Sequence, residues 1–516
     1  MSLERIDEER ELALTRGEFV AASAAGVATV VAPRALARPD KKQPSVAVVG
    51  AGIAGLTAAL QLRDHGIHAT VYESSGRLGG RMFSNHRYWA DDQVSEWCGE
   101  LVDSGHATVR RLAARFHLPL DDLRAATPRG ADDTYYFAGG YYRRAEVDRD
   151  FRPVYRAIER DSNAAGYPTT YAKSTRAGRA LDSMSLHRWI ESRVPGGHAS
   201  RMGKLLDVAY ATEYGADTSD QSALNLVYLM SDQPVRGRLS VLGVSDERYH
   251  IRGGNQRLPE AIAKHLGPGS VVTGMRLVRI ARRSGGSHAL TFERAGGTRT
   301  VVADIVLLAL PFTVLRHVDV SRAGFDPRKE LAIRTLGAGR SGKLQLQFRR
   351  RLWNETGPWP VRSTGGTYAD TGYQSTWDVS RAQPGSQGIL VDYTGGTAVD
   401  RLRTAVAYGT ANDAAVRRDA QRFLAQLEPV YPGISRLWTG AATSSKPHLD
   451  PNLRLSYSYW RVGQYQRIAG YERVRQGAVY FTGEHTSIDY QGYMEGGPSE
   501  GVRAAGQIAA ALRRTA

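Results

Sequence analysis

A glycine-rich turn close to the start of the chain constrains the fold more than any other feature of the sequence. Residues 50–55 read GAGIAG and follow a short apolar run at 45–49, which predicts a buried strand. The apolar spacing at 56–65 predicts a helix directly after the turn, and residues 69–73 predict a second strand that ends in an acid, Glu73. This order of strand, turn, helix, strand and acid is typical of a domain that binds a dinucleotide.

Each residue of this turn has a separate physical role. Gly50 permits the tight turn, Gly52 lets backbone amides reach a pyrophosphate, and Gly55 allows the helix to pack closely on the strand. The amino end of the helix, which includes Ala54, favours the negative charge of the phosphates. Glu73 would accept hydrogen bonds from an adenosine ribose. A glycine-rich turn without a ligand is the alternative, and the surrounding order of elements argues against it.

A second glycine-rich turn, GRLGGR at residues 76–81, follows Glu73 closely. Gly79 and Gly80 permit close approach of the backbone, and Arg81 adds a fixed positive charge beside the same pyrophosphate. Nicotinamide enzymes have no need of this turn. The two turns together resemble those of the flavin amine oxidase family, which comprises monoamine, polyamine and L-amino-acid oxidases and in which the second turn binds FAD. The resemblance, which includes bacterial members, therefore implies FAD as the cofactor.

The C-terminal segment carries the most specific resemblance to the family. A predicted strand at 478–481 precedes Gly483 and Glu484, and the letters GYMEG at 492–496 precede a predicted helix. The resemblance implies that Gly483 and Glu484 contact the cofactor, Glu484 at its ribityl chain or pyrophosphate. It also implies that amides near Met494 face the N1–C2=O edge of the flavin. That edge becomes negatively charged on reduction, and the amino end of a helix stabilises such charge.

Lys343 and two tyrosines are the expected catalytic residues. Residues 343–348 alternate between polar and apolar side chains, which predicts a strand with Lys343 on its polar face. Alternation alone favours a solvated lysine, whereas the resemblance implies the family lysine that holds a water against flavin N5 and assists reoxidation by oxygen. Tyr465 and Tyr493 resemble the family's aromatic pair, a slot for a neutral amine; two packed core tyrosines are the alternative. Gln464 replaces a flavin-linking cysteine, so FAD is expected to bind non-covalently.

The resemblance implies an α/β fold with α+β inserts. A Rossmann-like FAD-binding domain is expected to comprise residues 40–130, 250–345 and 455–516. A discontinuous substrate-binding domain is expected to comprise 131–249, which is mostly helical by pattern, and 346–454. The length of 516 residues agrees with more than one core.

Composition restricts the classes of partner. The single cysteine, Cys98, excludes an intramolecular disulfide and any metal site built from several thiolates. The formal net charge of +16 comes mostly from arginines spread along the chain, which favours a solvated surface over a nucleic-acid-binding face. The sequence has no uninterrupted apolar run long enough for a bilayer. We therefore expect small-molecule partners rather than nucleic acid or membrane; a homodimer stays an open alternative.

Residues 1–39 precede the predicted FAD-binding domain and support two interpretations. The order of residues 15–20, an apolar stretch at 21–32 and a small-residue site at 35–37 resembles a twin-arginine export signal. Only one arginine of the pair is present, because Gly17 occupies the second place, and the preceding segment is acidic. A disordered or helical leader is the alternative, so export and a cytoplasmic location both stay open.

The resemblance implies an oxidase that transfers hydride from the carbon beside an amine to flavin N5. Oxygen would then reoxidise the flavin to give hydrogen peroxide, and the imine would hydrolyse to ammonia and an aldehyde or 2-oxo acid. Simple amines, polyamines and L-amino acids all stay open as substrates. Many L-amino-acid oxidases carry an arginine for the carboxylate where residues 98–101 here read CGEL. A C–C desaturase of the same fold and a non-catalytic flavin-binding protein are the alternatives from other classes.

Overall fold

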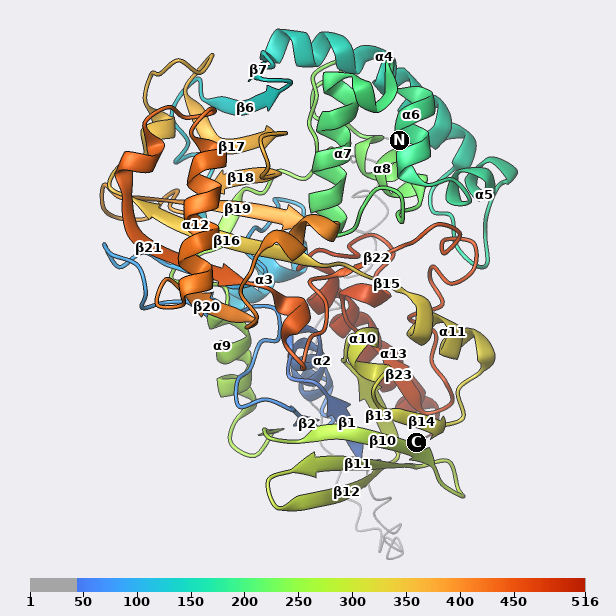
Figure 1. Ribbon diagram of the computed structural model, residues 1–516. Helices are drawn as coiled ribbons and strands as arrows, with labels where there is room; N and C mark the ends of the chain where they lie inside the picture. The colour runs from blue at the N-terminus through green and yellow to red at the C-terminus, as the bar shows by residue number, and fades with distance from the viewer. Residues whose placement is uncertain (1–43, 516) are drawn as a thin grey trace, which may run out of the picture. The chain divides into compact units, whose positions relative to one another are not determined.

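The computed structural model describes residues 44–515, which belong to one compact unit (Figure 1). The proposed signal or leader at 1–39 lies outside the described residues. Within residues 44–515, the helices include none that is both long and apolar enough to span a bilayer.

A five-stranded parallel sheet forms the half of this unit that contains the first glycine turn. Its central strand β1 (Val46–Val49) lies between β13 (Ile305–Leu308) and β2 (Ala69–Tyr72). Strand β23 (Val479–Phe481) pairs with β13 at one edge, and β9 (Val271–Val272) pairs with β2 at the other. Strands far apart in the sequence are therefore neighbours here, as Figure 1 shows, and the predicted strands of the α/β fold are confirmed.

The two faces of this sheet belong to two different hydrophobic cores. Val48 and Leu307 pack on the face that also receives helix α2 (Ile53–Asp64) and helix α13 (Gly496–Thr515). Their neighbours in sequence, such as Val306, point into the other core. All residues of β1 and β13 are buried, which is why these strands read as continuous apolar runs rather than alternating ones.

An eight-stranded sheet forms the second half of the unit. Its order is β20-β21-β16-β19-β18-β17-β6-β7. The first insert joins this sheet through β6, which pairs in parallel with β17, so both inserts build one layer. The expected domain boundary at residue 345 falls inside β16. The strands, in sheet order, are Tyr408–Thr410, Trp438–Ser445, Ser341–Phe348, Gly388–Gly395, Ser375–Asp378, Ser363–Ala369, Asp132–Phe137 and Gly140–Tyr141.

Helices of the first insert pack beside the eight-stranded sheet, in agreement with the helical pattern of residues 131–249. The Ser200 hydroxyl caps α7 by accepting a hydrogen bond from the amide of Gly203, and Gly215 ends this helix in the left-handed conformation, with φ of +60°. Helix α7 contacts β17, β18 and β19. The helices are α4 (Arg144–Ala165), α5 (Arg176–Asp182), α6 (Leu186–Arg193), α7 (Arg201–Tyr214) and α8 (Ala223–Met230).

Smaller sheets and helices complete the unit. A four-stranded sheet has the order β12-β11-β10-β14 (Gly297–Ala303, His288–Arg294, Arg276–Arg282, Asp319–Arg322). The two-stranded sheets are β3 with β4 (Ser84–Asn85, Ser95–Glu96), β5 with β8 (Leu120–Asp122, Tyr249–Ile251) and β15 with β22 (Gly337–Ala338, Ser458–Tyr459). The other helices are α3 (Ala107–Arg115), α9 (Arg257–Leu266), α10 (Phe312–Leu315), α11 (Pro327–Thr335) and α12 (Ala414–Leu427).

Candidate functional site

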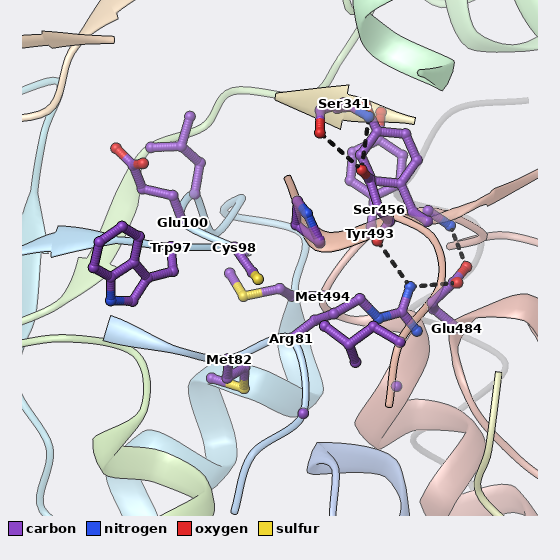
Figure 2. A pocket seen from close by; sticks show the side chains of 18 of the residues that line it. Arg81, Met82, Trp97, Cys98, Glu100, Ser341, Ser456, Glu484, Tyr493 and Met494 are labelled. Atoms are coloured by element: carbon purple, nitrogen blue, oxygen red, sulfur yellow. Dashed lines mark hydrogen bonds and ion pairs between the residues drawn. The ribbon is translucent and has the colours of Figure 1, made fainter. Parts of the chain in front are cut away.

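One cavity collects almost all of the residues that the sequence singled out (Figure 2). Its volume of about 370 Å³ lies within the range of ligand pockets. The two exceptions are Gly55, which lies behind the first turn, and Tyr465. The predicted residues that line it are Gly50, Gly52, Ala54, Glu73, Gly79, Gly80, Arg81, Lys343, Gly483, Glu484, Tyr493 and Met494.

The first glycine turn is shaped by close contacts on one side and open space on the other. Gly50 has a φ of +106°, and a Cβ atom added there would lie 2.8 Å from the carbonyl oxygen of Ala309. A Cβ atom at Gly55 would lie 2.0 Å from the carbonyl oxygen of Gly50. At Gly52, in contrast, an added Cβ atom would meet no described atom within 4 Å beyond its chain neighbours. The turn therefore leaves room for a ligand beside Gly52, where α2 begins.

The second turn lies directly against the first. The amide of Gly79 donates a 2.9 Å hydrogen bond to the carbonyl oxygen of Ala51, and a Cβ atom at Gly80 would lie 3.3 Å from the Cα atom of Gly52. The carboxylate of Glu73 accepts a 2.8 Å hydrogen bond from the amide of Ala51. These contacts combine the two turns into one cradle with an acid at its edge, which fits the expected shape of a dinucleotide site.

An ion pair joins this cradle to the C-terminal segment. Arg81 Nη1 lies 2.8 Å from Glu484 Oε1, as the dashed line in Figure 2 shows. Burial opposes ionisation of Glu484, but the charge of Arg81 and the hydrogen bonds from Arg81 and Gly492 act together with the nearby His485 to lower the pKa of this carboxyl below its usual value. The amide of Gly492 also donates to Glu484, over 2.8 Å. Glu484 therefore holds both Arg81 and the segment before Met494 in place. Met494 itself lies two positions before the start of helix α13.

Lys343 is buried in the cavity wall rather than solvated, with 6% of its surface exposed. Its Nζ atom lies 2.7 Å from Glu100 Oε2, and Trp377 Nε1 donates a 2.8 Å hydrogen bond to the other oxygen of Glu100. Burial opposes ionisation of Glu100, but Lys343 and Trp377 lower its pKa below the usual value. The polar face of β16 is covered by the segment around Glu96, whose carbonyl oxygen accepts from Gln345.

Tyr465 does not line the cavity, so the expected slot between Tyr465 and Tyr493 needs correction. The Tyr465 side chain is a packed core residue with 5% of its surface exposed. Its hydroxyl donates a 3.0 Å hydrogen bond to Asn225, and its ring centroid lies 4.5 Å from that of Trp460. The turn after Trp460 carries Tyr465 away from the cavity.

Tyr457 lines the cavity on the side where Tyr465 was expected. A Cβ atom at Gly492 would lie 3.9 Å from a ring carbon of Tyr457, so Tyr457 lies next to the segment that carries Tyr493. Its hydroxyl donates a 2.7 Å hydrogen bond to the carbonyl oxygen of Thr212. A signal was available in the sequence, because Ser456 and Ser458 flank Tyr457 in a short alternating run, and Tyr457 lies directly before β22.

Glu213 is a cavity residue that no motif in the sequence marks as functional. The Tyr493 hydroxyl donates a 2.9 Å hydrogen bond to its carboxylate. Burial raises the pKa of Glu213 to about 7, although the hydrogen bond from Tyr493 opposes the shift. Glu213 lies in the last turn of α7, 280 positions before Tyr493, and only the packing of the first insert brings it to the cavity.

Known proteins resemble this chain over most of its length. The family model described as flavin containing amine oxidoreductase matches residues 53–509. A putative L-amino-acid oxidase of Bacillus subtilis, YobN, is 23% identical over 90% of this chain and 94% of its own length. The L-amino-acid oxidase of Mus musculus is 25% identical over 92% of this chain and 72% of its own length.

Solved structures share the same architecture. Cyclohexylamine oxidase from Brevibacterium oxydans IH-35A has a TM-score of 0.77 at 21% identity, over 92% of this chain and 100% of that one. Wild-type putrescine oxidase bound to putrescine has a TM-score of 0.74 at 18% identity, over 91% of this chain and 99% of that one. At these identities the likeness shows a shared fold.

The open space at Gly52 predicts a substitution that separates folding from cofactor binding. We expect Gly52→Val to raise the dissociation constant for FAD about ten-fold or more, because the added methyl groups occupy the cradle where a pyrophosphate approaches the backbone. The melting temperature of the apoprotein should change by no more than ~4 °C, the cost of a poorer helix cap. Gly140→Val, at another glycine with open space, is the control. Wild-type affinity for FAD in Gly52→Val would show that the phosphates bind elsewhere.

Proposed function

The chain belongs to the flavin containing amine oxidoreductase family, whose members are FAD-dependent oxidoreductases, and we propose that it oxidises an amine inside the cavity with oxygen as electron acceptor. FAD held in the cradle would supply the hydride acceptor, and oxygen would take up the electrons to give hydrogen peroxide. The imine product hydrolyses to ammonia and an aldehyde or a 2-oxo acid. The observation that supports this most strongly is that both glycine turns, Lys343, Tyr457 and Tyr493 line one cavity.

In this proposal, Tyr457 and Tyr493 hold the substrate amine. Aromatic faces attract the nitrogen of an amine, and their rings exclude water around the carbon that loses hydride. The hydrogen bonds from Tyr457 to Thr212 and from Tyr493 to Glu213 fix the two rings before substrate enters. The protein thus contributes position and polarity, and no side chain has to act as a nucleophile.

Lys343 is the residue proposed to assist the oxygen half of the reaction. Its ammonium group is held by Glu100 at 2.7 Å and by the carbonyl oxygen of Glu96 at 3.4 Å, which leaves one proton for another partner, such as an ordered water. A fixed positive charge in a buried site stabilises the negative charge that develops as oxygen is reduced. Glu100 keeps this charge in place and acts as a positioning residue.

L-amino acids are the second candidate class of substrate. The relatives from Bacillus subtilis and Mus musculus are named as L-amino-acid oxidases. Residues 98–101 carry no arginine for a carboxylate, but Arg381 lines the cavity and offers one. Its Nε atom donates to the backbone carbonyl oxygen of Asp378 over 3.0 Å, so the guanidinium group is fixed at the cavity wall.

The most direct test of the function is an anaerobic panel of amines and L-amino acids. At least one substrate should bleach the visible absorbance of the bound flavin, and air should restore it with release of one hydrogen peroxide per turnover. Absorbance and a peroxidase-coupled assay measure the two steps. Purified protein without flavin, or flavin that stays oxidised with every compound, would contradict the proposal.

The role of Lys343 predicts an asymmetric effect on the two half-reactions. Lys343→Met should slow reoxidation by oxygen about 100-fold and reduction by substrate far less, because only the oxygen step develops negative charge beside the lysine. Stopped-flow absorbance measures both rates. Lys343→Met combined with Glu100→Gln serves as a control without an uncompensated buried carboxylate. Equal slowing of both half-reactions would reject the assignment.

Separate substitutions of Tyr457 and Tyr465 show which tyrosine contacts the substrate and which belongs to the hydrophobic core. Tyr457→Leu should lower kcat/KM for an amine about ten-fold or more, because an aromatic face contributes about 1–2 kcal/mol to binding a desolvated amine nitrogen. Tyr465→Leu should instead lower the melting temperature, since it removes packing from a buried core. Steady-state kinetics and calorimetry on both variants measure the two effects. If Tyr465→Leu lowered kcat/KM more than Tyr457→Leu does, Tyr465 rather than Tyr457 would form the slot with Tyr493.

A further inference from the structure

The end of the cavity beyond Tyr493 is lined by three acids from separate elements. Asp133 belongs to β6, Glu213 to the last turn of α7, and Glu247 to the loop before β8. Because Asp133, Glu213 and Glu247 line the same cavity, we call these three carboxyl groups the acidic cluster; the charges of Asp103, Glu213 and Asp133 all act on Glu247. Through Glu213, the acidic cluster is in direct hydrogen-bond contact with Tyr493.

The acidic cluster differs from the other cavity acids because it has no paired cation. Glu100 is paired with Lys343 and Glu484 with Arg81. Within residues 44–515, the ion pairs closer than 4.0 Å include none to Asp133, Glu213 or Glu247. Unpaired carboxylates in a partly buried site are unfavourable without a cation to bind.

Two further features make this end of the cavity attractive to a cation. Helix α7 directs its carboxyl end here, since Thr212, Glu213 and Tyr214 all line the cavity, and the carboxyl end of a helix favours positive charge. Arg381 also lines the cavity, and its charge acts on both Glu247 and Asp133, as the charge of Arg144 does on Asp133, but one cavity-lining arginine is outnumbered by the three acids. This local excess of acidic groups contrasts with the net charge of +16 for the whole chain.

Burial raises the pKa of Glu247 to about 8, and the neighbouring acids add to the shift. A cation that enters the acidic cluster favours the ionised forms of these acids, so its binding is expected to release protons. Glu247 also has a φ of +43°, a conformation unusual for this residue type, and its amide donates a 2.8 Å hydrogen bond to Asp103. This contact helps to hold the backbone at the cavity wall.

We propose that the substrate carries, besides the amine that is oxidised, a second cationic group, which binds to Asp133, Glu213 and Glu247. This inference rests on the proposed amine oxidase function, because the first amine must lie between Tyr457 and Tyr493. The shared chemistry is that of a diamine or polyamine, or of an L-amino acid with a cationic side chain. In the second case, Arg381 binds the carboxylate.

Paired substrates of equal length test the proposal in the holoenzyme. Diaminobutane against butylamine, and L-lysine against L-norleucine, differ chiefly in the terminal cation. In at least one pair, we expect kcat/KM to be about ten-fold or more higher for the compound with the second cationic group. This is the effect expected of one charge-assisted hydrogen bond. Glu247→Gln should reduce this preference about ten-fold. Asp133→Asn serves as a second variant if Glu247→Gln does not fold, and Glu330→Gln, an exposed acid outside the cavity, is the control.

Equilibrium binding gives a readout that does not depend on turnover. Diguanidinobutane should bind the oxidised holoenzyme more tightly than butylguanidine. Calorimetry in buffers of different ionisation enthalpy should detect the release of protons on binding. Glu247→Gln should reduce the difference in affinity between the two guanidines. Equal kcat/KM values within both pairs, or equal binding of the two guanidines, would overturn the inference and leave the proposed function intact. No bleaching by any member of either pair would count against the proposed function itself. If Arg381→Met loses activity on L-lysine but keeps activity on diaminobutane, the natural substrate belongs to the L-amino-acid class.

Discussion

The ion pair between Arg81 and Glu484 is the contact on which the candidate site depends most. These residues are 403 positions apart in the sequence, yet their side chains meet at 2.8 Å in the cavity wall. Removal of one partner from such a buried pair costs about 3–5 kcal/mol, because the other charge is left without compensation. Glu484 also accepts from Gly492, so the same pair positions the segment that carries Tyr493. Cradle and substrate slot are thus held by one electrostatic contact.

The charges of the cavity are arranged in two different ways. Beside the cradle, each acid is satisfied within the protein: Glu484 by Arg81, Glu100 by Lys343, and Glu73 by backbone amides. Such groups are rigid because their partners are permanent. The acids beyond Tyr493, including Glu213 and Glu247, lack permanent cations among the described residues and are available to a ligand. A preorganised region for the cofactor therefore adjoins a region that gains its counterion from outside.

Much of the fold follows from local sequence, whereas the site requires contacts that local sequence does not determine. Strands β1 and β13 were predictable because strands buried on both faces read as continuous apolar runs. Tyr465 was wrongly selected because residue type alone does not distinguish it from Tyr457, and only the course of the chain after β22 separates the two. The contribution of β6 to the eight-stranded sheet was missed because its partner β17 lies more than 200 residues further along. Glu213 reaches the cavity through the same long-range assembly.

The five-stranded sheet has a consequence for how the protein is made. Its central strand begins at Val46, but the edge strand β23 ends only at Phe481, and helix α13 packs on α2 still later in the chain. A ribosome-bound nascent chain therefore lacks both the edge strand and the Glu484 carboxylate until the segment at residues 479–484 has emerged. Such long-range pairing is slow, because distant segments lose chain entropy before their contacts form. We therefore expect the cofactor to be captured only after this segment has joined the sheet.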